Sequence, residues 1–304
     1  MTSTPLVSVI VPVFNDIDRL QHCLAALEQQ TYPKSQYEVI VIDNGSTEGN
    51  VAEVVAGFGQ AIATFEARSG SYAARNRGLE LAKGDVIAFT DADCIPAADW
   101  LENGITVLLN TPNCGLVAGR IEIFFKNPSK LTIVERYESV LAFQQQEHLE
   151  QYRYGSTANV FTFRQVIDRV GAFDATLKSN GDFEWGRRVA AHGYQQIYAE
   201  TACVAHPARH SFAELYRRSI RLAGGIYDAQ IQRCGTAWQR NKFFIRSVLE
   251  DFLSPILEIP EILSNSNLKT IDQKIEVYFM SLLVKYIRGF EKIRLKFGGV
   301  SSRG

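Results

Sequence analysis

The sequence predicts an α/β fold, in which a mixed, mainly parallel sheet is flanked by helices and followed by a helical C-terminal extension. In the first 96 residues, short runs rich in Val and Ile alternate with segments whose apolar residues recur every three or four positions. Strands that alternate with helices in this way are typical of parallel sheets with right-handed crossovers. The alternation weakens after about Ala97, and strand patterns become scarce beyond a capping box at Ser211–Glu214.

The first predicted strand is Val7–Val13, which is β-branched and apolar on both faces, as in a buried parallel strand. Pro12 has no N–H to donate and is expected to help end this strand. The same patterns predict strands at Glu38–Ile42, Ala61–Glu66 and Val86–Asp93, and helices from Ile17 to Leu27, from Val51 to Phe58 and over Gly70–Lys83, the last with Gly84 at its C′ position.

The elements after Ala97 are less regular. We expect helices at Trp100–Leu109, from Leu131 to Gln151, at Val166–Val170 (closed by Gly171) and at Asp182–His192. We expect strands at Gly115–Phe125 and Gln196–Val204, the first of them antiparallel to the others. Gly155–Phe163 is expected to be a strand or an extended loop.

The composition excludes some classes of protein. The 304 residues carry a formal net charge of −1, which gives no electrostatic reason to expect nucleic acid binding. The five cysteines are scattered, without Cys-x-x-Cys or Cys/His ligand spacing, and predict reduced thiols in a cytoplasmic protein. The N-terminus lacks the basic segment of a secretory signal, and no run of about 18 uncharged apolar residues predicts a transmembrane helix.

The stretch Gly84–Pro96 holds the most informative polar residues. Its apolar run, Val86–Phe89, is followed by two aspartates one residue apart, Asp91 and Asp93. Open α/β sheets bind ligands at the carboxyl ends of their strands, where this pair is expected. Carboxylates there suit a hard divalent cation, which in turn suits a diphosphate. The alternative is that the aspartates merely begin a turn.

Two further polar residues follow the same logic. Asp43 ends the second strand, where its carboxylate is placed to accept hydrogen bonds from a nucleobase or a ribose; it is also placed to start an Asx turn with Asn44–Gly45. Arg75 lies on the third helix and suits either a phosphate or an acidic loop, whereas the plain alternative is a solvated helix face.

A series of motifs in order resembles the family-2 glycosyltransferases, which have a GT-A fold. The resemblance covers about Pro5–His210. One departure is Gly181, which stands where a frequent form of the family has Glu before the sixth motif's Asp. The motifs are V-S-V-I-V-P-V-F-N (Val7–Asn15), V-I-V-I-D-N-G-S-T (Val39–Thr47), A-A-R-N-R-G (Ala73–Gly78), D-A-D (Asp91–Asp93), V-G-A-F-D (Val170–Asp174), N-G-D-F-E-W (Asn180–Trp185) and His206.

The resemblance implies an inverting enzyme that moves a sugar from a nucleoside-diphosphate donor, expected to be UDP-linked, to an acceptor hydroxyl in polysaccharide or lipid-linked glycan synthesis. It implies Mn2+ or Mg2+ as cofactor. Residues 1–210 would form the catalytic domain, with a nucleotide-binding half over 1–96 and an acceptor half over 97–210, and residues 211–304 the helical extension. Two alternatives remain open: a sugar nucleotidyltransferase, and a non-catalytic relative that binds nucleotide-sugar as a scaffold subunit.

The resemblance also assigns roles to residues. Asp182 would be the catalytic base, which faces the acceptor hydroxyl, and it is also placed to cap its helix. Trp185 is either a platform for the acceptor or a core residue. The remaining roles are Asp93 and Asp91 at the metal, His206 as a third metal ligand or diphosphate contact, Asp43 and Arg75 at the nucleotide, Pro12 and Asn15 in the loop around the nucleobase, and Asn159 at the donor sugar or the acceptor.

The last helix of the extension pairs an apolar stripe with basic residues. After position 284, six positive charges stand against one acid, Glu291. Basic amphipathic helices bind anionic membrane surfaces, so peripheral contact with the inner face of a membrane is one interpretation. Packing on the catalytic domain or a homodimer is the other. The six are Lys285, Arg288, Lys292, Arg294, Lys296 and Arg303.

Overall fold

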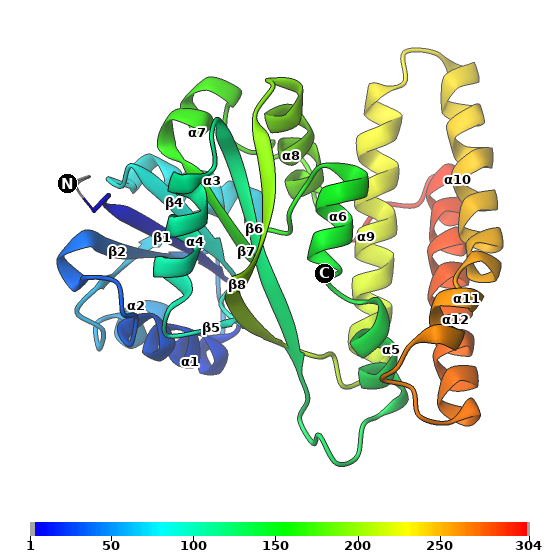
Figure 1. Ribbon diagram of the computed structural model, residues 1–304. Coiled ribbons are helices and arrows are strands. Elements are labelled where there is room, and N and C mark those ends of the chain that lie inside the picture. Colours follow the sequence, from blue (N-terminus) through cyan, green and yellow to red (C-terminus); the bar gives the residue numbers. More distant parts are fainter. Residues whose placement is uncertain (1–3, 303–304) are drawn as a thin grey trace. The chain divides into compact units, whose positions relative to one another are not determined.

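Eight strands form one mixed sheet in the computed structural model, which describes residues 4–302 (Figure 1). The strand order is β3-β2-β1-β4-β7-β6-β8-β5. The chain divides into two units, and each is described by itself. The first comprises the residues up to Glu122 together with Phe143–Thr176 and Gly181–His206, and the second comprises Ile123–Ala142, Leu177–Asn180 and the residues from Pro207 onward.

The first four long strands are parallel, as predicted. β1 pairs with β2 on one side and with β4 on the other, and β2 also pairs with β3. The buried faces of β1, β2 and β4 are filled with Val and Ile, because strands covered on both faces exclude water from both. The bounds are β1 (Val7–Val13), α1 (Ile17–Glu28), a 3-10 turn at Lys34–Gln36, β2 (Tyr37–Asp43), α2 (Val51–Val55), β3 (Ala61–Phe65), α3 (Ser71–Leu81) and β4 (Val86–Thr90).

Antiparallel strands extend the sheet beyond β4. β7 runs antiparallel to both β4 and β6. β6 therefore has the same direction as the first four strands, and the antiparallel direction predicted for Gly115–Phe125 is wrong, because β7 is the reversed strand between β4 and β6. The bounds are β5 (Ile95–Pro96), α4 (Trp100–Asn110), β6 (Cys114–Phe124), α6 (Gln145–Tyr152), β7 (Asn159–Phe163), α7 (Arg164–Val170), α8 (Gly181–Ala191) and β8 (Gln195–Pro207). All five cysteines are free.

Two predictions about helices are wrong. The single helix expected from Leu131 to Gln151 is two helices, α5 (Ile133–Leu141) and α6. They are separated at Phe143, whose φ of 52° is left-handed and therefore cannot continue a right-handed helix. Gly84 does not follow α3 as a C′ glycine, because α3 ends at Leu81 and its C-cap, Ala82, is extended. Gly84 instead donates its N–H to the Ser8 hydroxyl (2.8 Å) beside β1.

The second unit is a helical bundle. Apolar residues of α5 pack with residues from the last helices in one core, which holds Val134, Tyr137 and Leu215 among others. The boundary predicted at residue 210 differs from this arrangement, since the second unit also takes residues 123–142 and 177–180. None of the helices among residues 4–302 is long and apolar enough to cross a membrane. The other helices are α9 (Phe212–Arg233), α10 (Ala237–Leu257), α11 (Ile259–Ser264) and α12 (Ile271–Lys296).

Gly84→Ala is expected to destabilise the first unit. A Cβ at this position would lie 2.5 Å from the Ser8 backbone N and 2.8 Å from the Leu6 carbonyl O, and backbone atoms cannot move aside without shifting β1. Overpacking of this kind typically costs about 1–3 kcal/mol, which chemical denaturation can measure. Gly59→Ala is the matched control, because a Cβ there meets nothing within 4 Å. Equal stability of the two variants would contradict the explanation.

Candidate active site

The predicted polar residues gather at one edge of the sheet. β1, β2 and β4 are neighbours and parallel, so their carboxyl ends open at the same edge. The ends of these strands and the loops that follow them carry Asn15, Asp43, Asp91 and Asp93. This is the edge at which open α/β sheets bind ligands.

The first two loops hold each other in place. Asn15 has a φ of 49°, a left-handed conformation that Asn tolerates, and its Oδ1 accepts the Thr47 backbone N–H (2.7 Å). Asp43 Oδ1 accepts the N–H of Ser46 (2.8 Å), which confirms the turn predicted there. Pro12 pairs in register with Ile42 one residue before β1 finishes, and the pairing of β1 with β4 ends at Ile10, two residues before Pro12. Contact of these three residues with a nucleotide stays a prediction.

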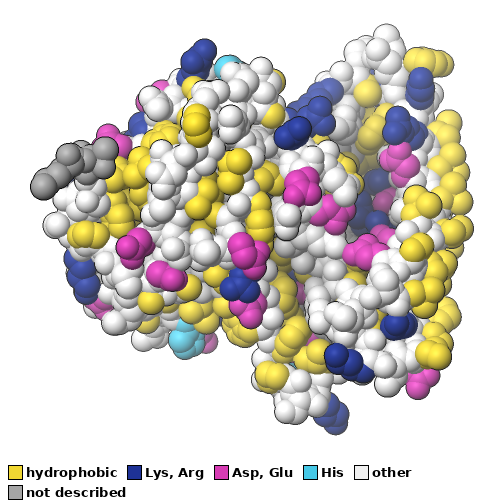
Figure 2. Space-filling view, in the orientation of Figure 1, with side chains coloured by type: hydrophobic (Ala, Val, Ile, Leu, Met, Phe, Trp, Pro, Cys, Tyr) yellow, Lys and Arg dark blue, Asp and Glu magenta, His cyan; other side chains and the backbone are white. Residues whose placement is uncertain are grey.

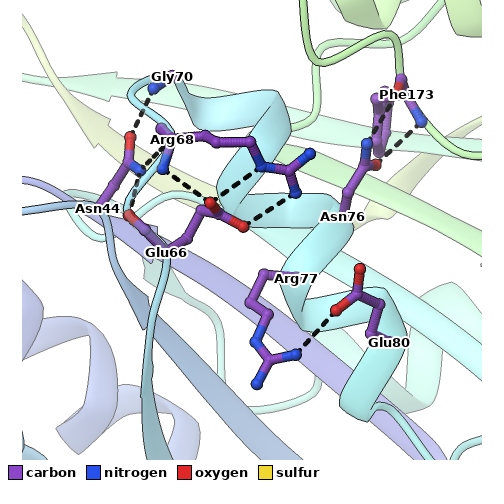
Figure 3. A network of polar contacts seen from close by, with 8 residues as sticks. All are labelled: Asn44, Glu66, Arg68, Gly70, Asn76, Arg77, Glu80 and Phe173. Carbon is purple, nitrogen blue, oxygen red and sulfur yellow. Dashed lines mark hydrogen bonds and ion pairs between the residues drawn. The ribbon is translucent and has the colours of Figure 1, made fainter.

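A polar network orders the loop before α3 (Figure 3). Asn44 donates to the carbonyl oxygens of Glu66 (3.0 Å) and Arg68 (2.8 Å) and accepts the N–H of Gly70 (2.7 Å). On α3 itself, Asn76 exchanges two hydrogen bonds with the backbone of Phe173 (2.7 and 3.0 Å). The side chains of two motifs, N-G-S-T and A-A-R-N, therefore fix backbone segments that border the site.

Arg75 holds the loop after β4. Its side chain is 4% exposed and its Nη2 forms an ion pair with Asp91 Oδ1. The guanidinium also lies over the ring of Tyr72, 5.7 Å from the centroid. The acidic-loop contact suggested by the sequence is therefore present, and the burial of the side chain excludes a solvated helix face. Contact of Arg75 with a nucleotide stays a prediction.

Asp93 and His206 form a candidate metal pair. His206 Nε2 lies 3.4 Å from Asp93 Oδ2, and Cys94 completes a group whose ligand atoms lie within 4.8 Å of one another. Burial raises the pKa of the Cys94 thiol well above its usual value, with the charges of Asp93 and Asp91 adding to the effect. Only a thiolate binds metal well, so the carboxylate and the imidazole, but not this thiol, fit a divalent cation.

The imidazole of His206 is positioned by an aromatic contact. The ring of Phe143 lies 4.4 Å from it, centroid to centroid, at an interplanar angle of 44°. The left-handed backbone of Phe143 that breaks the helix prediction thus directs a side chain to this histidine. Strained backbone of this kind tends to persist where a site requires it.

Asp182 lies in the first turn of α8, within the helix rather than before it. Its Oδ1 accepts the N–H of Phe183 (2.9 Å) and the hydroxyl proton of Tyr72 (3.3 Å). Burial raises the pKa of Asp182, while the Phe183 N–H, the charge of Arg75 and the Tyr72 hydroxyl oppose the rise. A carboxylate with a raised pKa is a stronger base than an ordinary aspartate.

Two of the predicted residues, Asn159 and Trp185, lie in the core. Asn159 is fully buried, its Nδ2 donates to the carbonyls of Arg120 (2.8 Å) and Ala202 (2.9 Å), and its Oδ1 accepts the indole N–H of Trp100 (2.8 Å). We therefore assign it a structural role rather than a ligand contact. Trp185 is 1% exposed and donates to the Gly171 carbonyl (3.0 Å), which makes it a core residue and not an acceptor platform.

Comparison with known proteins identifies the family. The family model of glycosyl transferase family 2 matches residues 8–179. The chain belongs to glycosyl transferase family 2. Among curated members, it is 39% identical over 254 residues to glycosyltransferase AglE of Haloferax volcanii, a match that covers 82% of this chain and 79% of AglE. Another member, YfnE of Bacillus subtilis, is 33% identical over 150 residues, which are 47% of this chain and 34% of that protein.

Solved structures give this family-2 chain a GT-A fold. The mannosyltransferase PcManGT from Pyrobaculum calidifontis, in complex with GDP-Man and Mn2+, aligns with a TM-score of 0.64 at 20% identity and covers 98% of this chain and 89% of its own. GalNAc-T7 with UDP, GalNAc and Mn2+ aligns with a TM-score of 0.55 at 16% identity, over 69% of this chain and 45% of its own. At these identities the likeness concerns the fold.

Two residues at the site were not predicted, Tyr72 and Phe143. Tyr72 stands next to the A-A-R-N motif, but its spacing carries no sign of a partner 110 positions away. Phe143 lies where the sequence predicts an unbroken helix. Their contacts are tertiary, so no local pattern in this family-2 chain could reveal them.

Asp182→Asn is expected to stabilise the protein at neutral pH. The folded pKa of Asp182 lies above its unfolded value, so the stability associated with this group is complete at low pH and is lost as the pH rises through the folded pKa. A tenfold difference between the folded and unfolded acid dissociation constants corresponds to about 1.4 kcal/mol. The amide keeps an acceptor for Tyr72 and Phe183 but carries no charge.

Thermal unfolding of both proteins between pH 5 and pH 8 measures this effect. The variant's advantage should grow with pH. A variant less stable than the parent protein at pH 8 would contradict a raised pKa for Asp182.

Proposed function

We propose that this chain is an inverting glycosyltransferase that uses a nucleoside-diphosphate sugar, with UDP as the nucleotide. The observation that carries the proposal is the set of carboxylates in the first unit, each with a different partner: Asp91 with Arg75, Asp93 with His206, and Asp182 at the start of α8 with Tyr72. Transfer of a sugar from a diphosphate needs charge stabilisation at the leaving group and a base at the acceptor, and this set supplies both.

Asp93 and His206 would hold a divalent cation, with Asp91 beside them. When bound, Mn2+ or Mg2+ would offset the negative charge that develops on the diphosphate leaving group. The coordination sphere would be open to a diphosphate in this arrangement, because only two side chains of the described group fit the cation. Mn2+ in the structures of PcManGT and GalNAc-T7 supports this assignment.

Asp182 would take the proton of the acceptor hydroxyl. As the acceptor oxygen bonds to the anomeric carbon, the bond from that carbon to the diphosphate breaks on the opposite face, and the proton passes to the carboxylate. General-base assistance of this kind typically contributes about 10²–10⁴-fold. The acceptor that we infer is a growing polysaccharide or a lipid-linked glycan, and this inference rests on analogy within the family.

The choice of UDP depends on the base pocket. Asp43 ends β2, where its carboxylate would meet the N–H of a uracil or a ribose hydroxyl. The two structural neighbours hold different nucleotides, GDP-Man in one and UDP in the other. A nucleotide panel therefore decides this point.

Thermal unfolding with UDP, GDP and dTDP, each with and without Mn2+, tests the donor site. UDP with Mn2+ should raise the midpoint most, by the equivalent of about 2.7 kcal/mol at a hundred times its Kd, and Asp93→Asn should remove the part that depends on Mn2+. Glu80→Gln, at the other end of α3, is the control because this exposed acid pairs with Arg77 on the same helix. Asp182→Asn should still bind UDP but transfer no sugar.

Each other outcome overturns a defined part of the proposal. A larger shift of the midpoint with GDP or dTDP would assign the donor to that nucleotide instead of UDP. Equal shifts with and without Mn2+ would show that nucleotide binding does not depend on the metal. If the protein binds a nucleoside triphosphate and a sugar phosphate and releases pyrophosphate, it is a sugar nucleotidyltransferase. If no nucleotide shifts the midpoint, the non-catalytic scaffold is the better description.

We also propose that the second unit contacts an anionic membrane surface. Most of the basic side chains of α12 that suggested membrane contact form ion pairs within the unit. Lys285 pairs with Glu258 (2.9 Å). Lys292 and Arg288 pair with Asp251 (2.5 and 3.5 Å), and Arg294 pairs with Glu291 (2.7 Å). Arg303 lies outside the described residues. The feature that favours membrane contact is therefore the exposed apolar face of the unit rather than the basic charge of α12.

That face follows α10 and α12. In Figure 2 a column of hydrophobic side chains runs down the right edge of the view, where α10 lies. A groove of about 800 Å³ runs along α10, and Trp238, at 68% exposed, stands at its start. Arg240, Lys242 and Arg246 are exposed on the same turns, and apolar faces flanked by basic residues and Trp lie in the headgroup layer of membranes. The exposed apolar residues are Ile245, Leu249, Leu253, Ile256 and Leu257 on α10 and Ile271, Ile275, Phe279, Leu283, Tyr286 and Phe290 on α12.

Sedimentation with vesicles tests this contact. The protein should bind vesicles that contain phosphatidylglycerol more than vesicles of phosphatidylcholine alone. Leu249→Gln combined with Leu253→Gln should weaken binding several-fold, because each substitution removes apolar area that the membrane would bury. Ile62→Gln removes an equally accessible apolar side chain (49% exposed) from β3 and should change nothing. A dimer in solution that the same double variant dissociates, without vesicle binding, would assign the face to a second copy instead.

A further inference from the structure

We propose that Tyr72 is a positioning residue for Asp182, and that Gly181 is the residue that makes this possible. The inference rests on the proposed role of Asp182 as the base. It assigns different roles to the two oxygens of that carboxylate: one accepts hydrogen bonds from the protein, and the other receives the proton of the acceptor.

Tyr72 is held between two neighbouring side chains. It is the second residue of α3 and is 6% exposed, one turn before Arg75. Its ring lies 5.7 Å from the ring of Phe173 and beneath the Arg75 guanidinium. A tyrosine packed in this way loses little further freedom when its hydroxyl makes a hydrogen bond, so the hydroxyl can define the position of its partner.

The hydroxyl is aimed at one oxygen of the carboxylate. Tyr72 donates to Asp182 Oδ1 (3.3 Å), and the same oxygen accepts the backbone N–H of Phe183 (2.9 Å). Among residues 4–302, no hydrogen bond to Oδ2 is present. Two donors therefore occupy Oδ1 and set the rotation of the carboxylate, which leaves Oδ2 to receive the acceptor proton.

Gly181 admits the tyrosine ring. A Cβ on Gly181 would lie 2.7 Å from Cε2 and 2.8 Å from Cδ2 and Cε1 of Tyr72, closer than real contacts allow. Any side chain at position 181 would push the ring away from the start of α8. The glycine that departs from the frequent family motif is thus the counterpart of Tyr72.

The bond also acts on the charge of the base. Burial raises the pKa of Asp182, with a smaller contribution in the same direction from the charge of Asp91, and the Phe183 N–H, Arg75 and Tyr72 oppose them. Burial likewise raises the pKa of Tyr72, so its hydroxyl keeps its proton and stays a donor. Loss of the hydroxyl would leave the carboxylate less well oriented and harder to ionise.

Tyr72→Phe tests the inference, because it keeps the ring and removes only the hydroxyl. We expect kcat to fall at least about tenfold, donor stabilisation by nucleotide and Mn2+ to stay unchanged, and the acidic limb of the kcat profile to move to higher pH. Tyr32→Phe is the matched control: Tyr32 is also 6% exposed and donates to a backbone carbonyl, that of Pro5 (2.7 Å), away from the site. Gly181→Ala should lower kcat in the parent protein but add little to Tyr72→Phe.

A double-mutant cycle supplies a readout that needs no substrate. A hydroxyl bonds more strongly to a carboxylate than to an amide, so Tyr72→Phe should lower the unfolding midpoint at pH 8 more in the parent protein than in the Asp182→Asn background. Equal losses in both backgrounds, or an unchanged kcat and pH limb, would overturn the role of Tyr72. If Asp182→Asn keeps full transfer, the base assignment fails instead, whereas an inactive Asp182→Asn with a fully active Tyr72→Phe removes only the further inference.

Discussion

The ion pair between the buried guanidinium of Arg75 and Asp91 is the interaction on which the site depends. The Arg75 side chain is almost inaccessible, and it joins α3 to the loop after β4 through Asp91 and to the ring of Tyr72. Removing one partner of a buried ion pair typically costs about 3–5 kcal/mol, because the other charge is left without compensation. The position of Asp91 after β4 is therefore tied to α3.

Three chemically identical side chains acquire different properties from this arrangement. Asp91 faces a permanent positive charge, Asp93 faces an imidazole, and Asp182 faces a phenol hydroxyl and a backbone N–H. Burial raises the pKa of Asp93, and the charge of His206 counteracts this rise. A site that separates the environments of its carboxylates can separate their roles, so that metal binding and proton transfer need not compete for one group.

Most of the fold and much of the site could be predicted from the sequence. The parallel strands follow from runs such as Val7–Val13, in which nearly every residue is buried, and the aspartates follow from their place at the ends of such runs. The prediction fails where a distant contact overrides a local pattern. Phe143 breaks a periodic helix to reach His206, and Gly84 serves the neighbouring β1 rather than the end of its own helix. Asn159 is polar and is expected from the family resemblance at the donor sugar or the acceptor, yet both the Oδ1 and the Nδ2 of its amide form hydrogen bonds within the core.

The division of the chain into two units has a consequence for how such proteins can be recombined. The chain passes from one unit to the other after Glu122, Ala142, Thr176, Asn180 and His206. The helical bundle is thus interleaved with the sheet along the chain and is not an appended tail. A chimera that exchanges only the residues after position 206 would pair a foreign bundle with the resident α5, whose Val134 and Tyr137 pack in the same core as Leu215 and Val277. Exchange of the bundle between relatives therefore requires its three segments, 123–142, 177–180 and the residues from 207 onward, to move together.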